Sequence, residues 1–61
     1  MPFVQIDLAE GRTVEQKREV AKKITEAICE VFQCPAEAVG ITMRDLPRTN
    51  FAKAGKLLSD K

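Results

Sequence analysis

Two short segments of alternating hydrophobicity flank one amphipathic segment, and this order constrains the fold more than any other feature of the chain. Alternation over about residues 2–8 predicts a strand with Val4, Ile6 and Leu8 on one face. Residues 39–44 alternate in the same way and predict a second strand. Because a helical segment separates the two strands, they are expected to pair in parallel through a right-handed crossover. The sequence therefore predicts an α/β fold made of a single βαβ unit.

The intervening helix carries its own start and stop signals. Thr13 followed by Gln16 forms a capping box, which predicts the first turn of the helix. The helix is expected to run to about Phe32, since Pro35 restricts the residue before it. Cys29 is predicted to lie roughly opposite the apolar stripe, exposed or facing another subunit, and chemically unreactive. The stripe expected to face the sheet is Val20, Ile24, Ala27, Ile28 and Val31.

The rest of the chain is short and irregular. Residues 35–38 are compatible with one further helical turn that has proline at its first position. Residues 46–58 predict a loop with a small hairpin around Gly55. No internal repeat or linker is evident, so residues 1–61 are interpreted as a single domain.

The length of the chain limits how it can be stabilised. A domain of this size buries only about 60% of the surface that its unfolded chain exposes. With only two cysteines and no histidine, neither a disulfide framework nor a zinc site is expected. One βαβ unit also leaves one sheet face and both sheet edges open. The prediction is therefore that βαβ units assemble into a homo-oligomer.

Charge and hydrophobicity exclude several classes of partner. Lys and Arg number 10 against 9 Asp and Glu, and the two signs interleave along the helix instead of forming a basic face. This pattern is typical of a solvated surface and predicts no nucleic-acid partner. No signal peptide or membrane-spanning run is evident, so no membrane association is expected. The cysteine usage favours a reducing compartment and predicts a cytoplasmic protein.

Few side chains are available for catalysis. The chain has no His, no G-x-S-x-G motif and no glycine-rich phosphate loop after the first strand. The remaining bases are carboxylates, lysine amines and the chain terminus. Pro2 directly follows the initiator Met1, whose removal by methionine aminopeptidase would expose a secondary amine. On its own, such a proline more often reflects processing than catalysis.

The pattern of the whole chain gives Pro2 more weight. Pro2 is followed by Leu-Ala-Glu-Gly-Arg-Thr-Val-Glu-Gln-Lys over residues 8–17, and Phe51 is followed by Ala-Lys-Ala-Gly. The chain ends in Leu-Ser-Asp-Lys over residues 58–61. Together these segments resemble the 4-oxalocrotonate tautomerase family, over nearly the full length and without an evident gap.

The resemblance implies a function and a set of site residues. Family members are small βαβ subunits assembled as hexamers (trimers of dimers), and they need no cofactor or metal. At the matching positions, Pro2 is the general base and acid that moves a proton between oxygen and carbon of an enol or dienol acid. Arg12 binds the substrate carboxylate, and Phe51 forms an apolar wall that keeps the prolyl amine neutral. Without the resemblance, Arg12 is interpreted as a solvated turn residue and Phe51 as a core or interface aromatic.

One position departs from the family pattern. The classical enzyme of the family has a second arginine at the start of the second strand, which polarises the substrate carbonyl, whereas this chain has Gly40. Arg44 lies four residues further along, about 13 Å away at the usual strand rise, and is too distant to replace it within one subunit. We hypothesise that Arg48, in the loop before Phe51, takes over this role.

Two functional hypotheses follow. The first is a cytoplasmic, cofactor-free, homohexameric tautomerase that acts on a small keto or enol acid. The alternative is a non-catalytic oligomeric module, or a subunit of a hetero-oligomer, that kept the fold but lost the full site. Gly40 supports the alternative, whereas the presence of Pro2, Arg12 and Phe51 together supports the first hypothesis.

Overall fold

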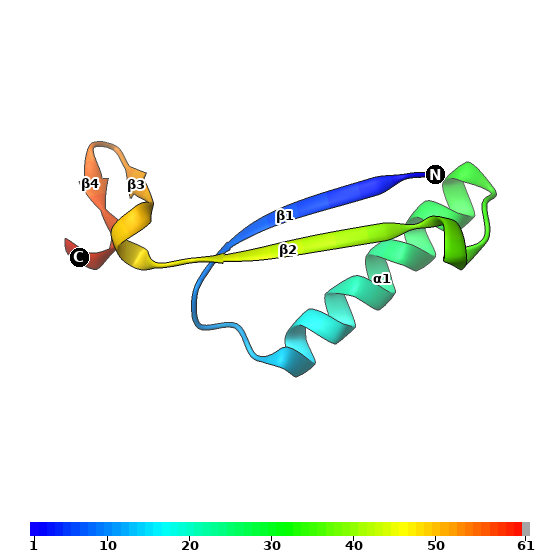
Figure 1. The fold of residues 1–61 in the computed structure, drawn as a ribbon, viewed down its shortest axis with the longest axis horizontal. Helices are drawn as coiled ribbons and strands as arrows, with labels where there is room; N and C mark the ends of the chain where they lie inside the picture. Colours follow the sequence, from blue (N-terminus) through cyan, green and yellow to red (C-terminus); the bar gives the residue numbers. More distant parts are fainter. Residues whose placement is uncertain (61) are drawn as a thin grey trace.

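A computed structural model describes residues 1–60 and confirms the βαβ unit with parallel strands and a small C-terminal hairpin (Figure 1). The strands lie one or two residues later than the alternation predicts, and the turn expected at residues 35–38 is a 3₁₀-helix. In chain order the main elements are β1 (Phe3–Ala9), α1 (Val14–Phe32) and β2 (Gly40–Leu46), followed by the hairpin strands β3 (Ala52–Lys53) and β4 (Lys56–Leu57). Short 3₁₀-helices span Ala36–Ala38, Arg48–Asn50 and Leu58–Asp60.

The ladder between β1 and β2 begins at the proline. Phe3 pairs with Gly40 at one end of the parallel ladder, and Ala9 pairs with Leu46 at the other. Pro2 has no N–H to donate, but its carbonyl accepts a hydrogen bond of 3.0 Å from the Gly40 N–H. The ladder therefore uses only the carbonyl of Pro2.

The capping box at the start of α1 forms as predicted. The Gln16 N–H donates to Thr13 Oγ1 at 3.1 Å, and the Thr13 N–H donates to Gln16 Oε1 at 3.0 Å. Two backbone donors at the helix start are thereby satisfied. At the other end Gln33 adopts a left-handed conformation (φ 54°) and ends the helix before Pro35.

The orientation of α1 about its axis differs from the expectation. The predicted stripe is only partly covered by the sheet, since Val20 is 43% exposed and Val31 72% exposed. A sheet of two strands is narrower than the apolar band of this helix, so it covers only one side of that band. The half-buried residues of α1 are Lys17, Ala21, Ile24, Thr25, Ile28 and Cys29.

Cys29 was predicted to be exposed or to face another subunit, and the first of these alternatives is wrong. Its side chain is half-buried instead of lying on the far side of the helix, and it interacts with Cys34 just beyond the helix end. Partial burial, and then the neighbouring Cys34 and Glu37, raise the pKa of the Cys29 thiol. A raised thiol pKa lowers the thiolate fraction, which agrees with the prediction that this cysteine is unreactive.

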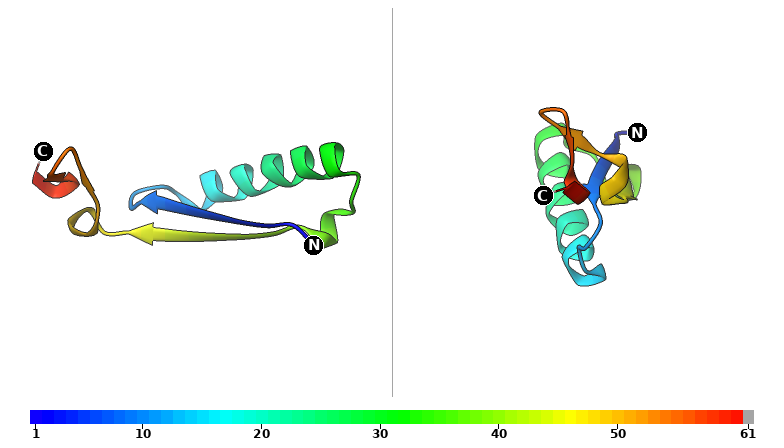
Figure 2. Two further views of the ribbon diagram at one scale, coloured as in Figure 1. Left: turned by 90° about the horizontal axis from the view of Figure 1, so that it is seen from above. Right: turned by 90° about the vertical axis from the view of Figure 1, so that its left-hand side faces the viewer.

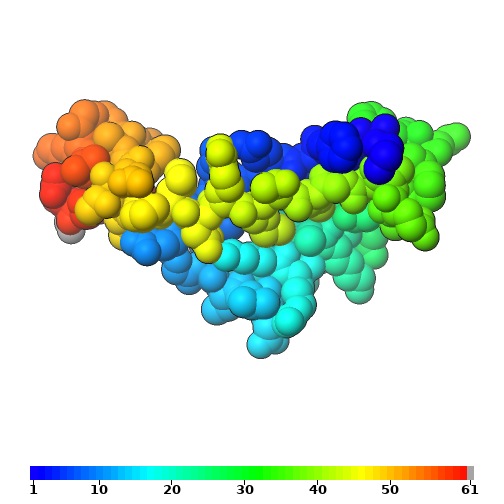
Figure 3. All heavy atoms as spheres, viewed as in Figure 1, coloured from blue at the N-terminus to red at the C-terminus, as the bar shows by residue number. Residues whose placement is uncertain are grey.

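The subunit is extended, and its layers stay thin (Figure 2). Its radius of gyration is 14.5 Å, whereas a compact chain of this length has about 10.5 Å. The accessible surface is 4941 Å², compared with about 4,000 Å² for a compact monomer of this mass. No side chain within residues 1–60 is fully buried. The N-terminal residues and the C-terminal hairpin lie at opposite ends of the molecule (Figure 3).

The cap gives a test of the fold. We expect Thr13→Ala to lower the free energy of unfolding by about 1 kcal/mol, because it removes the acceptor for the Gln16 N–H. Urea denaturation at one fixed protein concentration measures the change. Thr49→Ala is the control, since the Thr49 hydroxyl contacts only its neighbour Asn50. Equal denaturation midpoints for Thr13→Ala and wild type would contradict the capping role.

Candidate active site

Pro2 is the residue immediately before β1, and its side chain is half-buried. In the described chain Met1 precedes it and is 80% exposed, so the Pro2 nitrogen is part of a peptide bond. An exposed Met1 is accessible to an aminopeptidase, and its removal would leave Pro2 with a secondary amine. Since the ladder uses only the Pro2 carbonyl, that amine would not be committed to the sheet.

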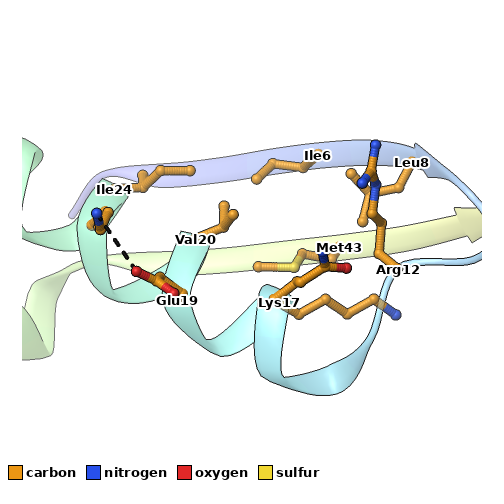
Figure 4. A pocket seen from close by; sticks show the side chains of 10 residues that line it. Ile6, Leu8, Arg12, Lys17, Glu19, Val20, Ile24 and Met43 are labelled. Atoms are coloured by element: carbon orange, nitrogen blue, oxygen red, sulfur yellow. Dashed lines mark ion pairs between the residues drawn. The ribbon is translucent and has the colours of Figure 1, made fainter.

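Arg12 lies at the other end of β1, in the turn that leads to α1. Gly11 has a φ of 119°, a conformation that favours glycine, and it turns the chain away from the sheet there. The Arg12 side chain is exposed and extends past Leu8 at the end of the strand (Figure 4). The seven residues of β1 separate Pro2 from Arg12 by more than about 20 Å at the usual rise per residue.

Arg48 lies at the same end of the sheet as Arg12. Its backbone N–H donates a hydrogen bond of 3.2 Å to Glu10 Oε2, and Glu10 in turn donates its N–H to the carbonyl of Leu46 at 3.0 Å. The turn after β1 and the segment after β2 are therefore joined directly. Arg48 itself is exposed and begins the 3₁₀-helix that precedes Phe51.

Phe51 connects this 3₁₀-helix to the hairpin. Its carbonyl accepts a hydrogen bond of 3.0 Å from the Leu58 N–H, which closes the base of the hairpin. The Phe51 ring is 43% exposed. The structure thus brings Arg12, Arg48 and Phe51 to one end of the subunit and leaves Pro2 at the other.

Phe3 of the neighbouring strand β1 occupies the space beside Gly40, where the classical enzyme has its second arginine. A Cβ atom built on Gly40 would lie 3.0 Å from Cδ1 and 3.4 Å from Cε1 of Phe3, which is its partner in the ladder. Sequence reasoning did not single out Phe3 as a site residue. The available signal was a large aromatic directly after Pro2, at the alternation position that points away from the helix.

Arg44 is not free to compensate. Its Nε donates to Asp7 Oδ1 at 2.9 Å and its Nη2 to Asp7 Oδ2 at 3.3 Å, a two-pronged pair on the sheet face opposite α1. The hydrogen bond to Asp7 and the charge of that carboxylate raise the pKa of Arg44. Arg44 is therefore paired with Asp7 as well as too far along the strand to replace the arginine that is absent at Gly40.

An open groove of about 480 Å³ lies between α1 and the sheet. Its walls are mainly aliphatic, and Arg12 lies at its rim (Figure 4). Lys17 contributes to the lining and pairs with Asp45 of β2 at 2.6 Å. The groove is suited to packing, because its walls are mainly aliphatic and Pro2 does not line it. The apolar residues that line it are Ile6, Leu8, Val20, Ile24 and Met43.

Within residues 1–60 no group of three or more His, Cys, Asp or Glu side chains is arranged to hold a metal ion. Nor does any helix of the described chain have the length and apolar character needed to cross a membrane.

Comparison with known proteins decides the family. The sequence profile described as "Tautomerase enzyme" matches residues 2–61, beginning at Pro2 itself. The chain belongs to the tautomerase family. A probable tautomerase of Streptococcus pneumoniae serotype 4 is 44% identical to this family member over 57 residues, which cover 93% of this chain and 95% of that protein.

Solved structures agree with the sequence comparison. YwhB, described as a homologue of 4-oxalocrotonate tautomerase, is 38% identical and superposes with a TM-score of 0.91 over 98% of both chains. A heterohexameric 4-oxalocrotonate tautomerase from Chloroflexus aurantiacus is 28% identical, with a TM-score of 0.92 over 98% of this chain and 97% of that one. The resemblance to the 4-oxalocrotonate tautomerases is therefore confirmed for this tautomerase-family chain.

Proposed function

We propose that this chain is a cytoplasmic, cofactor-independent tautomerase that interconverts the keto and enol forms of an enol or dienol carboxylic acid. The observation that carries the proposal is the position of Pro2. The family match starts at this residue, the preceding Met1 is exposed, and the Pro2 nitrogen plays no part in the sheet. With Met1 removed, Pro2 is the general base and acid.

The proposed chemistry is a proton transfer within one bound substrate. The neutral prolyl nitrogen accepts the proton of the enol hydroxyl, and the resulting ammonium returns a proton to carbon to give the keto acid. Chain-terminal amines ordinarily have pKa values of about 7.7–8.0, close to the range in which a base works best at neutral pH. Arg12 binds the carboxylate through its guanidinium fork, and Phe51 shields the amine from water.

This chemistry needs more than one copy of the chain. Pro2 and Arg12 lie at opposite ends of β1, so one subunit does not bring them to the same substrate. We infer a homohexamer, a trimer of dimers, in which different copies supply the two ends. The large accessible surface and the open groove along α1 support assembly, and one relative is described as a heterohexamer.

The assembly is tested by sedimentation. We expect the purified protein at micromolar concentration to sediment as a hexamer, because no side chain of residues 1–60 is fully buried in the isolated subunit. A folded monomer at that concentration would contradict the proposal.

The base is tested by kinetics on the mature protein. Intact mass should show that Met1 is absent, and Pro2→Ala should lower kcat/KM for ketonisation of 2-hydroxymuconate by about 10²–10⁴-fold. Arg12→Ala should lower kcat/KM chiefly through KM, since it removes binding of the carboxylate. Retained Met1, or equal rates for Pro2→Ala and wild type, would argue against catalysis by Pro2.

Arg48 is proposed as the second cation, which stabilises the charge on the substrate oxygen. Arg48→Ala should lower kcat by about 10²–10³-fold, by analogy with loss of an oxyanion donor. Lys53→Ala is the matched control, because Lys53 is an exposed cation of the hairpin outside the proposed site. Unchanged turnover in Arg48→Ala would exclude this role.

Gly40 favours a second candidate. A chain that lacks the arginine of the family can serve as one subunit of a hetero-oligomer in which another chain supplies it, or as a non-catalytic module. The heterohexameric relative supports the first form. A homomeric preparation that assembles and yet shows no turnover that depends on Pro2 would favour this candidate.

A further inference from the structure

An aromatic side chain packs onto a glycine next to the proposed base. Phe3 follows Pro2 directly, and the Cδ1–Cε1 edge of its ring lies against Gly40, whose N–H donates a hydrogen bond to the Pro2 carbonyl. Phe3 is nevertheless 77% exposed in the subunit, so most of the ring surface is available to another molecule. The backbone of Gly40 allows this close approach, since any side chain there would press against the ring.

Within the described residues of one subunit, the surface around Phe3 and Gly40 has no cationic side chain that is free of an ion pair. In the subunit, as far as the structure describes it, the nearest cation along β2 on this sheet face is Arg44, which is paired with Asp7. Arg12 and Arg48 lie at the far end of the strands. A carboxylate placed on the Phe3 ring would therefore lose water without gaining a cationic side chain of the same subunit as its partner.

The two ends of the subunit thus offer different chemistry to a substrate. In a 2-hydroxy-2-enoic acid the carboxylate and the enol oxygen are on adjacent carbons, so both can be bound by the cations Arg12 and Arg48, which share one end. The remainder of the molecule needs a separate surface next to the base. The exposed Phe3 ring suits a planar hydrocarbon group.

We propose that Phe3, packed on Gly40, is a specificity-determining residue that selects enol monocarboxylic acids with an aryl or alkyl substituent over dicarboxylic acids. This inference rests on the proposed function, because it assigns the substrate class of the same site. Phe3 contacts the hydrocarbon part of the substrate, and Gly40 leaves room for the edge of the ring.

The experiment compares two probes on the mature protein. The enol of phenylpyruvate is an aryl monocarboxylate, and 2-hydroxymuconate is a dicarboxylate. We expect wild type to have the higher kcat/KM on the aryl probe, and Phe3→Ala to shift the ratio of the two kcat/KM values by about tenfold or more toward the dicarboxylate. Adding Gly40→Arg to Phe3→Ala should shift it further, because removing the ring makes room for the cation.

Matched variants separate specificity from assembly. Phe32→Ala removes an aromatic that is 65% exposed at the end of α1, which covers the opposite sheet face, and it should leave the ratio at the wild-type value. Phe3→Leu keeps an apolar side chain and should give an intermediate ratio. Sedimentation of each variant shows whether the assembly is intact.

Each outcome decides a distinct point. If turnover of both probes depends on Pro2 but the Phe3 variants leave the ratio unchanged, the specificity role is overturned and the tautomerase proposal stands. If Phe3→Ala and Phe3→Leu both dissociate the assembly, Phe3 is an interface residue and the specificity role is overturned. If neither probe is turned over in a way that depends on Pro2, both proposals fail.

Discussion

The pairing of only two parallel strands under one helix is the constraint on which the other features of this subunit depend. Fixing the backbone costs roughly 1–2 kcal/mol per residue, and burial of apolar surface is the main compensation. Here α1 covers one face of the sheet, the other face and both edges stay open, and no side chain of residues 1–60 is fully buried. In the proposed homo-oligomer, further copies cover these open surfaces. The same shortage allows a site to be assembled from residues that lie at opposite ends of one subunit.

Proline at the start of the ladder connects the fold to the proposed chemistry. Every second residue inside β1 directs both its N–H and its carbonyl to β2, but Pro2 contributes only the carbonyl that accepts from Gly40. The nitrogen can therefore change from an amide to an amine without breaking a hydrogen bond of the ladder. Few positions in a strand would tolerate that change, which makes the first residue a suitable place for a catalytic terminus.

Local patterns were sufficient to predict the elements. Alternation located both strands to within two residues, and the capping box located the helix start, because each signal acts over a few residues. The rotation of α1 was predicted incorrectly, since its apolar band is wider than the sheet and the sequence does not say which side another subunit covers. The exposed position predicted for Cys29 is wrong for the same reason.

In the candidate site, too, short sequence segments predicted some residues, whereas contacts between residues far apart in the sequence were not predicted. Pro2, Arg12 and Phe51 were identified through a family resemblance, and the family is confirmed, although their roles stay predictions. The packing of Phe3 on Gly40 depends on strand register, which joins residues far apart in the sequence. The position of Arg48 depends on a hydrogen bond to Glu10, a contact of equally long range. Neither contact leaves a signal in a short window of sequence.

This chain has Gly40, next to the Phe3 ring, where the classical enzyme has an arginine. The difference affects the affinity for a second carboxylate and also the protonation of the proposed base. The proposed base must be neutral to accept a proton, and a water-poor, apolar surrounding favours the neutral form of an amine. A nearby arginine also favours the neutral amine, because its positive charge repels the ammonium form. Without that arginine, only the apolar surrounding favours the neutral amine. In the proposed assembly, Phe3 beside Pro2 and Phe51 from a neighbouring copy make the surrounding of the amine more apolar. The Phe3–Gly40 pair can therefore narrow the substrate range and still maintain the neutral amine on which the proposed reaction depends.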